Sequence, residues 1–305
     1  MGEASLPRIA FAIPYYTGVE YLAETIASVL SQDIDDWEAV VVDDAGPEPA
    51  RDLIERLNDS RITYRRNANN LGLAGNWTAA IEATTAPLVT VLHADDLLLP
   101  HYARTMIELM GRHPGALAGH CRIELIDHTG EPTRTLSDSM KSLIRPKVRG
   151  DITTNGDKGL RSLLRGFWIF CPTLCYRREV FRTVEPFDGR WRFALDFSFV
   201  GRALLAGHRF VGTQVVGYRY RRHAANQTAL LTAQLTRFEE EMRLYGEFAD
   251  LAAARSWSKS MRTARLALIV RAHLVVTALR SLLKRDGRRA GEALRMVTRK
   301  VGSKK

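Results

Sequence analysis

Residues 88–96 read Leu-Val-Thr-Val-Leu-His-Ala-Asp-Asp, a five-residue strand-forming run that leads into two acidic residues. A short run rich in branched apolar side chains and followed by polar ones is typical of a buried strand in a parallel sheet. Asp95 and Asp96 then lie where the strand reaches the edge of the sheet, which is where open α/β sheets bind ligands. Acidic residues in that position also cap helices, so this pair alone does not define a site.

Two similar runs precede this stretch. Residues 8–13 are mostly apolar and end at Pro14-Tyr15-Tyr16, and residues 38–42 end at Asp43-Asp44. The carboxyl ends of parallel strands share one edge of a sheet, so we expect the three polar clusters to lie together. Two acidic pairs at a shared crevice indicate a hydroxyl-rich ligand and a hard cation, because such cations prefer carboxylate ligands.

Apolar residues at helical spacing separate these runs, as at residues 20–30 and 76–84. Alternating strands and helices of this length predict an α/β fold whose parallel sheet is covered on both faces. After about residue 115 the pattern changes. We expect a long strand at 116–126, a polar and mobile surface segment at 128–158, and a last strand at 209–220.

Several classes of protein are disfavoured by the composition and motifs. No Gly-x-Gly-x-x-Gly follows the first strand, which argues against a dinucleotide-binding dehydrogenase. Cys121, Cys171 and Cys175 are too few for a disulfide framework, and we interpret them as reduced core thiols of a cytoplasmic protein. The first eight residues contain no apolar run, so no secretory signal is expected.

The positive charge of the chain is concentrated at its C-terminal end. Residues 255–305 carry 15 Lys and Arg against two acidic residues, whereas residues 1–254 have a net charge of −3. The segment is predicted to be helical, with Arg262, Arg265, His273, Thr277, Arg280 and Lys284 on one arc of a helical wheel and apolar residues on most of the rest.

Charged residues interrupt the apolar ones too often for a stable transmembrane helix. The pattern favours instead an interfacial helix on an anionic membrane surface. Packing of these helices against the rest of the chain, or against a second copy in a homo-oligomer, is the alternative. We do not expect nucleic acid as the partner, because the basic segment has no interleaved aromatic residues for stacking.

The clusters described above, taken with motifs farther along the chain, resemble the family 2 glycosyltransferases. The resemblance extends from residue 8 to about residue 228 and rests on the order and spacing of seven motifs. These motifs are Ile13-Pro14-Tyr15-Tyr16, residues 27–32, Val41-Val42-Asp43-Asp44, residues 70–77, residues 92–98, residues 172–178 and residues 220–228.

The resemblance implies a GT-A (Rossmann-like) fold, a mixed sheet flanked by helices. Residues 1–228 would form the catalytic domain and residues 229–305 a helical, basic extension. It also implies inverting transfer of a hexosyl or N-acetylhexosaminyl group from a nucleotide sugar to an acceptor hydroxyl. The expected setting is cell-surface polysaccharide or lipopolysaccharide synthesis, in the cytoplasm or peripherally on the inner face of the cytoplasmic membrane, with a glycan or lipid-linked glycan as acceptor.

The resemblance also assigns roles to individual residues of the donor site. Asp96 would ligate Mn²⁺ or Mg²⁺, Asp95 would contact the ribose or the metal, and His223 would be a third metal ligand or a diphosphate contact. A surface histidine is the alternative for His223. The donor site as a whole would be formed by Pro14, Tyr15, Tyr16, Asp43, Asn70, Asn76 and Asp95, where Asn70 and Asn76 are also compatible with capping a turn or helix.

Asp196, between Leu195 and Phe197, is the expected general base. Inverting transfer needs a carboxylate that accepts the proton of the attacking hydroxyl, and apolar neighbours increase its basicity. The alternative is that Asp196 only caps the helix that runs to Leu205. Two other functions remain open: a polyprenyl-phosphate sugar synthase, whose acceptor is already ionised, and a non-catalytic scaffold that binds sugar nucleotides.

Overall fold

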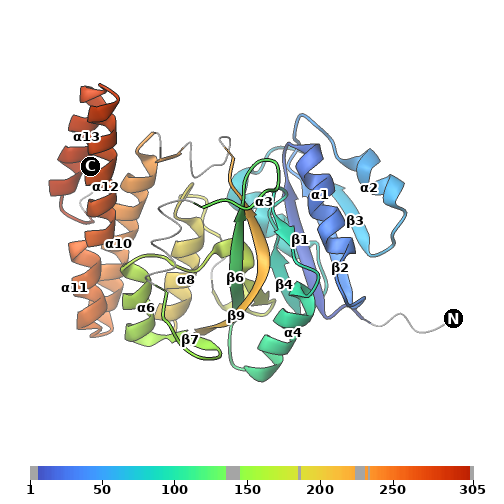
Figure 1. The fold of residues 1–305 in the computed structure, drawn as a ribbon. Coiled ribbons are helices and arrows are strands. Elements are labelled where there is room, and N and C mark those ends of the chain that lie inside the picture. Colours follow the sequence, from blue (N-terminus) through green and yellow to red (C-terminus); the bar gives the residue numbers. More distant parts are fainter. Residues whose placement is uncertain (1–5, 135–144, 185–186, 224–230, 233, 303–305) are drawn as a thin grey trace.

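A mixed sheet of nine strands runs through the middle of the molecule (Figure 1). This holds for the part of the chain that the computed structural model describes, namely residues 6–134, 145–184, 187–223, 231–232 and 234–302. The strand order is β3-β2-β1-β4-β8-β6-β9-β5, and β7 pairs with β9. The strands are β1 (Ile9–Tyr15), β2 (Trp37–Asp43), β3 (Ile62–Arg66), β4 (Leu88–Val91), β5 (Leu97–Leu98), β6 (Ala118–Ile126), β7 (Ile152–Asn155), β8 (Cys175–Arg177) and β9 (Arg209–Arg221).

Helices cover both faces of this sheet, as the alternating pattern predicted. Each face has its own hydrophobic cluster, the first beneath α1, α2 and α4 and the second beneath α3, α6, α8 and the C-terminal helices. The helices are α1 (Val19–Leu30), α2 (Arg51–Leu57), α3 (Gly72–Glu82), α4 (Tyr102–Arg112), α6 (Gly156–Leu164), α7 (Val180–Thr183), α8 (Leu195–Leu205), α10 (Thr236–Ala254), α11 (Ser258–Leu266), α12 (Leu268–Leu283) and α13 (Gly287–Thr298).

The sheet is parallel only in part. Strands β3, β2, β1 and β4 run parallel, but β8 pairs antiparallel with both β4 and β6. The mixed sheet implied by the resemblance is therefore confirmed, and the all-parallel sheet expected from the alternation is wrong beyond β4. The regular alternation of strands and helices that favours a parallel sheet ends after α4.

The expectation of a mobile surface segment over residues 128–158 is wrong at its C-terminal end. Residues 152–155 form β7, which pairs antiparallel with β9, and Gly156 begins α6. Ile152 and Thr154 point into the interior and the two residues that alternate with them are exposed. Four residues of alternating burial are too few to predict a strand from the sequence. The strand forms because it pairs with β9. Residues 135–144 lie outside the described part.

Three buried free cysteines agree with the prediction of reduced core thiols.

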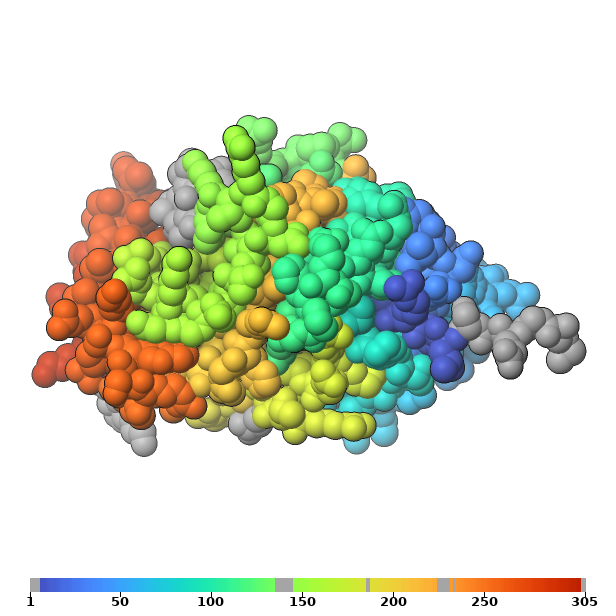
Figure 2. Space-filling model, turned by 90° about the horizontal axis from the view of Figure 1, so that it is seen from below, coloured from blue at the N-terminus to red at the C-terminus, as the bar shows by residue number. Residues whose placement is uncertain are grey.

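In the C-terminal segment, the helical prediction is confirmed, but the segment cannot be drawn on a single helical wheel. Ala267 adopts a left-handed conformation with φ of 45°, so the chain breaks there into α11 and α12. The C-terminal helices form the end of the molecule opposite α1 and α2, in orange and red at the left of Figures 1 and 2.

Candidate active site

Three strand ends meet at one edge of the sheet, as expected. The parallel register of β1 and β2 places Tyr15 beside Asp43, and β4 lies on the other side of β1. A cavity of about 2130 Å³ extends along this edge. Of the residues predicted for the site, its lining includes Pro14, Tyr15, Tyr16, Asn70, Asn76, Asp95, Asp196 and His223. Asp43 and Asp96 do not line it.

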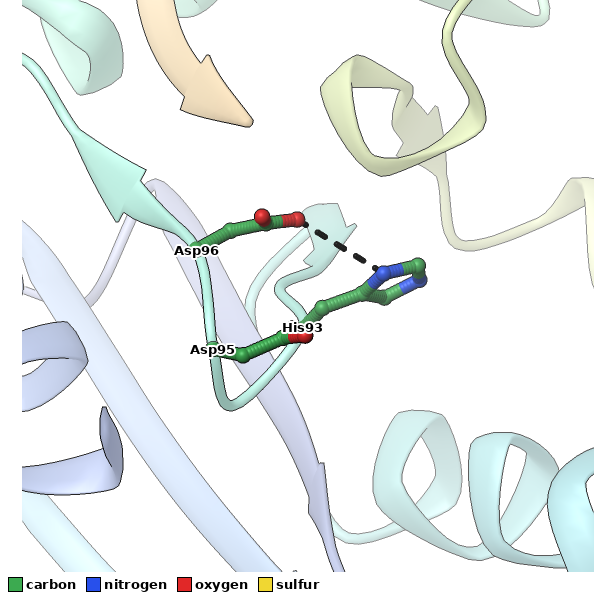
Figure 3. A group of neighbouring side chains, drawn as sticks. All are labelled: His93, Asp95 and Asp96. Atoms are coloured by element: carbon green, nitrogen blue, oxygen red, sulfur yellow. Dashed lines mark ion pairs between the residues drawn. The ribbon is translucent and has the colours of Figure 1, made fainter. Parts of the chain in front are cut away.

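His93, Asp95 and Asp96 in the loop after β4 form a group that can hold a metal ion, since one ligand atom from each lies within 4.8 Å of the others (Figure 3). Nδ1 of His93 lies 3.6 Å from Oδ2 of Asp96. Within the described chain Nε2 of His93 is buried without a hydrogen-bond partner. Burial lowers the pKa of His93, which keeps the imidazole neutral and therefore able to bind a metal.

Asp96 is fully buried and its carboxylate is held by β9. Its Oδ1 accepts a hydrogen bond from the backbone N–H of Arg221 at 2.8 Å, and its Oδ2 accepts one from the Tyr218 hydroxyl at 2.9 Å. Burial, together with the charge of Asp95, raises the pKa of Asp96 well above its ordinary value. Asp96 therefore ties the β4 loop to β9 as well as belonging to the possible metal group.

Asp95 faces the cavity and contacts the predicted third residue of the metal site. Nε2 of His223 lies 2.9 Å from Oδ2 of Asp95, and the His223 ring stacks on Tyr21 with ring centroids 5.3 Å apart. Burial acts to raise the pKa of Asp95, but the hydrogen bond from His223 and the electrostatic interactions with the two imidazole rings outweigh it, and the pKa lies below its usual value. The structure thus brings together two residues that are 128 positions apart.

Asp43 lies in the interior beside the cavity. Its Oδ2 accepts hydrogen bonds from the Tyr64 hydroxyl at 2.6 Å and from the Arg66 guanidinium at 2.5 Å, while Oδ1 accepts one from the backbone of Gly46. The neighbouring Asp44 lines the cavity and fixes the start of α3, because its carboxylate accepts from the backbone N–H groups at residues 71 and 72.

The remaining donor-site candidates differ in exposure. Tyr16 is 49% exposed and open to ligand, whereas Tyr15 is buried. Asn70 accepts a hydrogen bond from the backbone N–H of Gly72, so its capping role is present alongside its place in the cavity. Asn76 is buried and donates to the backbone carbonyls of Tyr15 and Val42, which fixes the ends of β1 and β2.

Asp196 lies in the first turn of α8 and lines the same cavity as Asp95. The N-cap position belongs to Ala194, so the interpretation of Asp196 as the cap residue is wrong. The N–H groups before the helix are bound instead by Glu240 of α10, whose buried carboxylate accepts from the backbone N–H groups of Arg192, Phe193 and Ala194 at 2.8 to 3.1 Å.

Comparison with known proteins identifies the family of this chain. The family model "Glycosyl transferase family 2" matches residues 10–184, more than half of the chain. The chain belongs to glycosyl transferase family 2. It is 30% identical over 225 residues to an uncharacterized glycosyltransferase of Nostoc sp., a match that covers 72% of this chain and 66% of that protein.

A second relative carries a more specific name. The GalNAc(5)-diNAcBac-PP-undecaprenol beta-1,3-glucosyltransferase of Campylobacter jejuni is 28% identical over 122 residues, which cover 39% of this chain and 40% of that one. The chain therefore matches about two thirds of the length of the Nostoc relative and less than half of the Campylobacter one.

Two solved structures share the GT-A fold of this family 2 chain. S. aureus TarS in complex with UDP-GlcNAc superposes with a TM-score of 0.60 at 15% identity, covering 94% of this chain and 91% of that one. The mannosyltransferase PcManGT from Pyrobaculum calidifontis, in complex with GDP-Man and Mn²⁺, also gives 0.60 at 15% identity, covering 96% and 86%. At this identity the likeness concerns the fold alone.

Three residues of this family 2 site were not predicted from the sequence. His93 belongs to the metal group, Glu240 holds the segment before Asp196, and Arg221 is buried and donates to backbone carbonyls of Asp95, Asp127 and His128. His93 and Arg221 occur inside the motifs that carry the family resemblance, so their positions in the sequence could have indicated a role in the site. No such indication exists for Glu240, because it follows the last motif and belongs to an ordinary helical pattern.

Proposed function

We propose that this chain is an inverting glycosyltransferase that moves a sugar from a nucleotide-sugar donor to an acceptor hydroxyl in cell-surface polysaccharide or lipopolysaccharide synthesis. The observation that supports this most directly is one cavity lined by the Asp95–His223 pair and by Asp196. A diphosphate held at the first and a hydroxyl held at the second are the two reactants that such a transfer needs. Family membership gives the same reaction class.

In this proposal His93, Asp95 and Asp96 hold the metal ion. When bound, a divalent cation neutralises the charge that develops on the leaving diphosphate. The unpartnered nitrogen of His93 fits a metal ligand, and Asp95 is the carboxylate that faces the cavity. We therefore give Asp95 the leading role among the three ligands, which our expectation had given to Asp96, and Asp96 in addition holds the loop on β9.

The proposed ligand set also carries a preference among metals. Mg²⁺ favours oxygen ligands, whereas Mn²⁺ also accepts an imidazole nitrogen. A site that includes His93 should therefore bind Mn²⁺ in preference to Mg²⁺. The variant His93→Asp supplies oxygen ligands only, and in a titration followed by thermal shift it should narrow the gap between the two metals. An unchanged ratio of the two affinities would exclude His93 as a ligand.

The donor nucleotide would occupy the cavity beside the ends of β1 and β2. Pro14 and Tyr16 line this region, and Asn70 adds an amide. Behind these residues lie three buried ones, Tyr15, Asp43 and Asn76. Asp43 would accept a hydrogen bond from the nucleobase once Arg66 or Tyr64 moves aside. Asn76 would support the site by fixing the ends of β1 and β2.

Asp196 would accept the proton of the acceptor hydroxyl as its oxygen attacks the anomeric carbon and the bond to the diphosphate breaks. Removing a general base typically lowers turnover by about 100-fold or more. Asp196→Asn should therefore lose at least that factor in transfer while binding of the donor is unchanged. Near-normal turnover of this variant would favour the polyprenyl-phosphate synthase, whose ionised acceptor needs no base.

Donor binding is tested separately by thermal shift with a panel of nucleotide sugars, with and without Mn²⁺. A ligand at 100 times its Kd stabilises the folded state by about 2.7 kcal/mol. We expect the correct donor to raise Tm only when Mn²⁺ is present, and Asp95→Ala to abolish that increase. Slow hydrolysis of the bound donor would in addition exclude the non-catalytic scaffold.

The acceptor in this proposal is a glycan or a lipid-linked glycan, and the enzyme works in the cytoplasm at the inner face of the cytoplasmic membrane. The name of the Campylobacter relative, which contains a diphosphoundecaprenol-linked acceptor, supports this class. The basic segment at residues 255–305 supports the position at an anionic membrane.

A further inference from the structure

Helix α12 carries a row of large apolar side chains on the outside of the molecule. On an α-helix these positions fall within an arc of about 120°. The exposed fractions reach 67% at Leu268 and 85% at Leu283. The members of this row, here called the α12 stripe, are Leu268, Val275, Val276, Leu279, Leu282 and Leu283.

The opposite side of α12 is already used for packing. Val270, Leu274 and Ala278 are buried in the hydrophobic cluster that also contains α8 and α10. The helix is therefore held on the protein by one side while the α12 stripe on another side has no contact that would bury it in the described chain. Scattered exposed leucines are normal on a protein surface, but a continuous row of six is not.

The one cation within the apolar part of α12 does not lie free on this surface. The guanidinium of Arg271 donates hydrogen bonds to the backbone carbonyls of Leu266, Val297 and Arg299, so it joins α12 to the end of α13. On a helical wheel Arg271 lies opposite the basic arc and interrupts the amphipathic pattern, but in the structure its guanidinium is bound to backbone carbonyl groups. The stripe itself remains uncharged.

Exposed cations lie at the ends of the helix. Arg262 and Arg265 precede it on α11, and Arg280, Lys284 and Arg285 are at its C-terminal end. The whole segment of residues 255–305 has a net charge of +13. An apolar row with basic neighbours is the pattern of a helix that lies in the surface of an anionic bilayer. Pairing with a second copy would instead place two such positive surfaces against each other.

Spanning the membrane is a poorer fit than lying on it. Among the described residues, one stretch, Ser258–Leu283, is long and apolar enough to cross a bilayer by length and composition. Ala267 divides this stretch, and the 16 residues of α12 reach about 24 Å, less than the roughly 30 Å of a hydrocarbon core. Its buried side also remains packed on the protein.

We propose that the α12 stripe docks on an anionic bilayer surface and places the acceptor end of the cavity beside the lipid, so that the acceptor is lipid-linked. Ile269, Val270 and His273 of the same helix line the cavity that contains Asp196. The cavity and the docked bilayer would thus be separated by about the width of one helix, roughly 10 Å. This step rests on the proposed transferase function, but the docking itself does not.

The docking is tested by sedimentation of the full chain with vesicles of phosphatidylglycerol and phosphatidylethanolamine, compared with vesicles of phosphatidylcholine alone. We expect binding to the anionic vesicles that weakens as salt is raised. Replacing two exposed apolar side chains of the α12 stripe with polar ones, in the double variant Leu279→Ser with Leu283→Ser, should weaken binding by at least about 10-fold. Leu251→Ser, at an exposed leucine on α10, is the matched control and should bind like the wild type.

Each outcome is informative. Equal binding by the double variant and the control would overturn the proposal, as would wild-type binding to neutral vesicles only. Loss of a dimer on light scattering in the double variant, without any vesicle binding by the wild type, would identify a second copy as the occupant instead. Donor-dependent thermal shift of the same variants reports the proposed function independently, and we expect it to be unchanged.

Discussion

At the scale of single residues, Glu240 holds the backbone segment that leads into Asp196. Glu240 is a positioning residue, because its carboxylate binds three consecutive backbone N–H groups just before α8. Glu240→Gln replaces one acceptor oxygen with a donor and should lower kcat by about 10- to 100-fold, since a displacement of a catalytic group by about 1 Å can cost about 100-fold. KM for the donor should stay constant, and Glu240→Asp should recover part of the loss. An equal fall in donor binding would mean general unfolding instead.

The same scale shows what the sequence can supply. Asp95 and Asp96 were both recognised from one motif, yet their roles separate only through β9. Tyr218 and Arg221 engage Asp96 from 122 and 125 positions away, and His223 engages Asp95. Adjacent acids have the same local pattern, so the sequence alone does not reveal which of them faces the cavity.

At the scale of elements, the site depends on the packing of α8 against α10. Gly201 of α8 lies against the Phe248 ring, and an added methyl group would overlap that ring. Gly201→Ala should therefore lower the free energy of unfolding by about 1–3 kcal/mol, as overpacking does. Gly111→Ala, in open space on α4, is the control and should raise it by about 0.5–1 kcal/mol. Urea denaturation measures the free energy of unfolding of both variants. If Gly201→Ala changed it in the same direction and by a similar amount as Gly111→Ala, the contact between α8 and α10 would be loose enough to accept the added methyl group.

Elements with a long periodic pattern were predictable, and those defined by pairing were not. Strands β1, β2 and β4 follow directly from their apolar runs, and α1 follows from its helical spacing of apolar residues. The two-residue β5 and the four-residue β7 are strands because β9 pairs with them. The predicted boundary between residues 1–228 and 229–305 remains a prediction, although one hydrophobic cluster includes residues of both α8 and α10.

At the scale of the whole molecule, the stability of the fold should depend on pH through His120. This residue of β6 is buried against Trp168 and Gly212, and burial lowers its pKa from the ordinary 6.5 to about 3. Below pH 6.5 the imidazole of His120 is therefore protonated in the unfolded chain but stays neutral in the folded chain until the pH approaches 3. Protons then favour unfolding, and the stability present above pH 6.5 is lost progressively as the pH falls toward 3.

Between pH 7 and pH 5 this linkage should cost about 2 kcal/mol of unfolding free energy. His120→Gln removes the titrating group, so its urea midpoint should change less than that of the wild type over the same interval, whatever its stability at pH 7. Parallel pH profiles for the two proteins would show that His120 is not the group responsible. The cavity lies along an edge of the sheet that contains β6 and β9. Because protonation of His120 destabilises this sheet, we expect metal-dependent donor binding to weaken at acid pH as well.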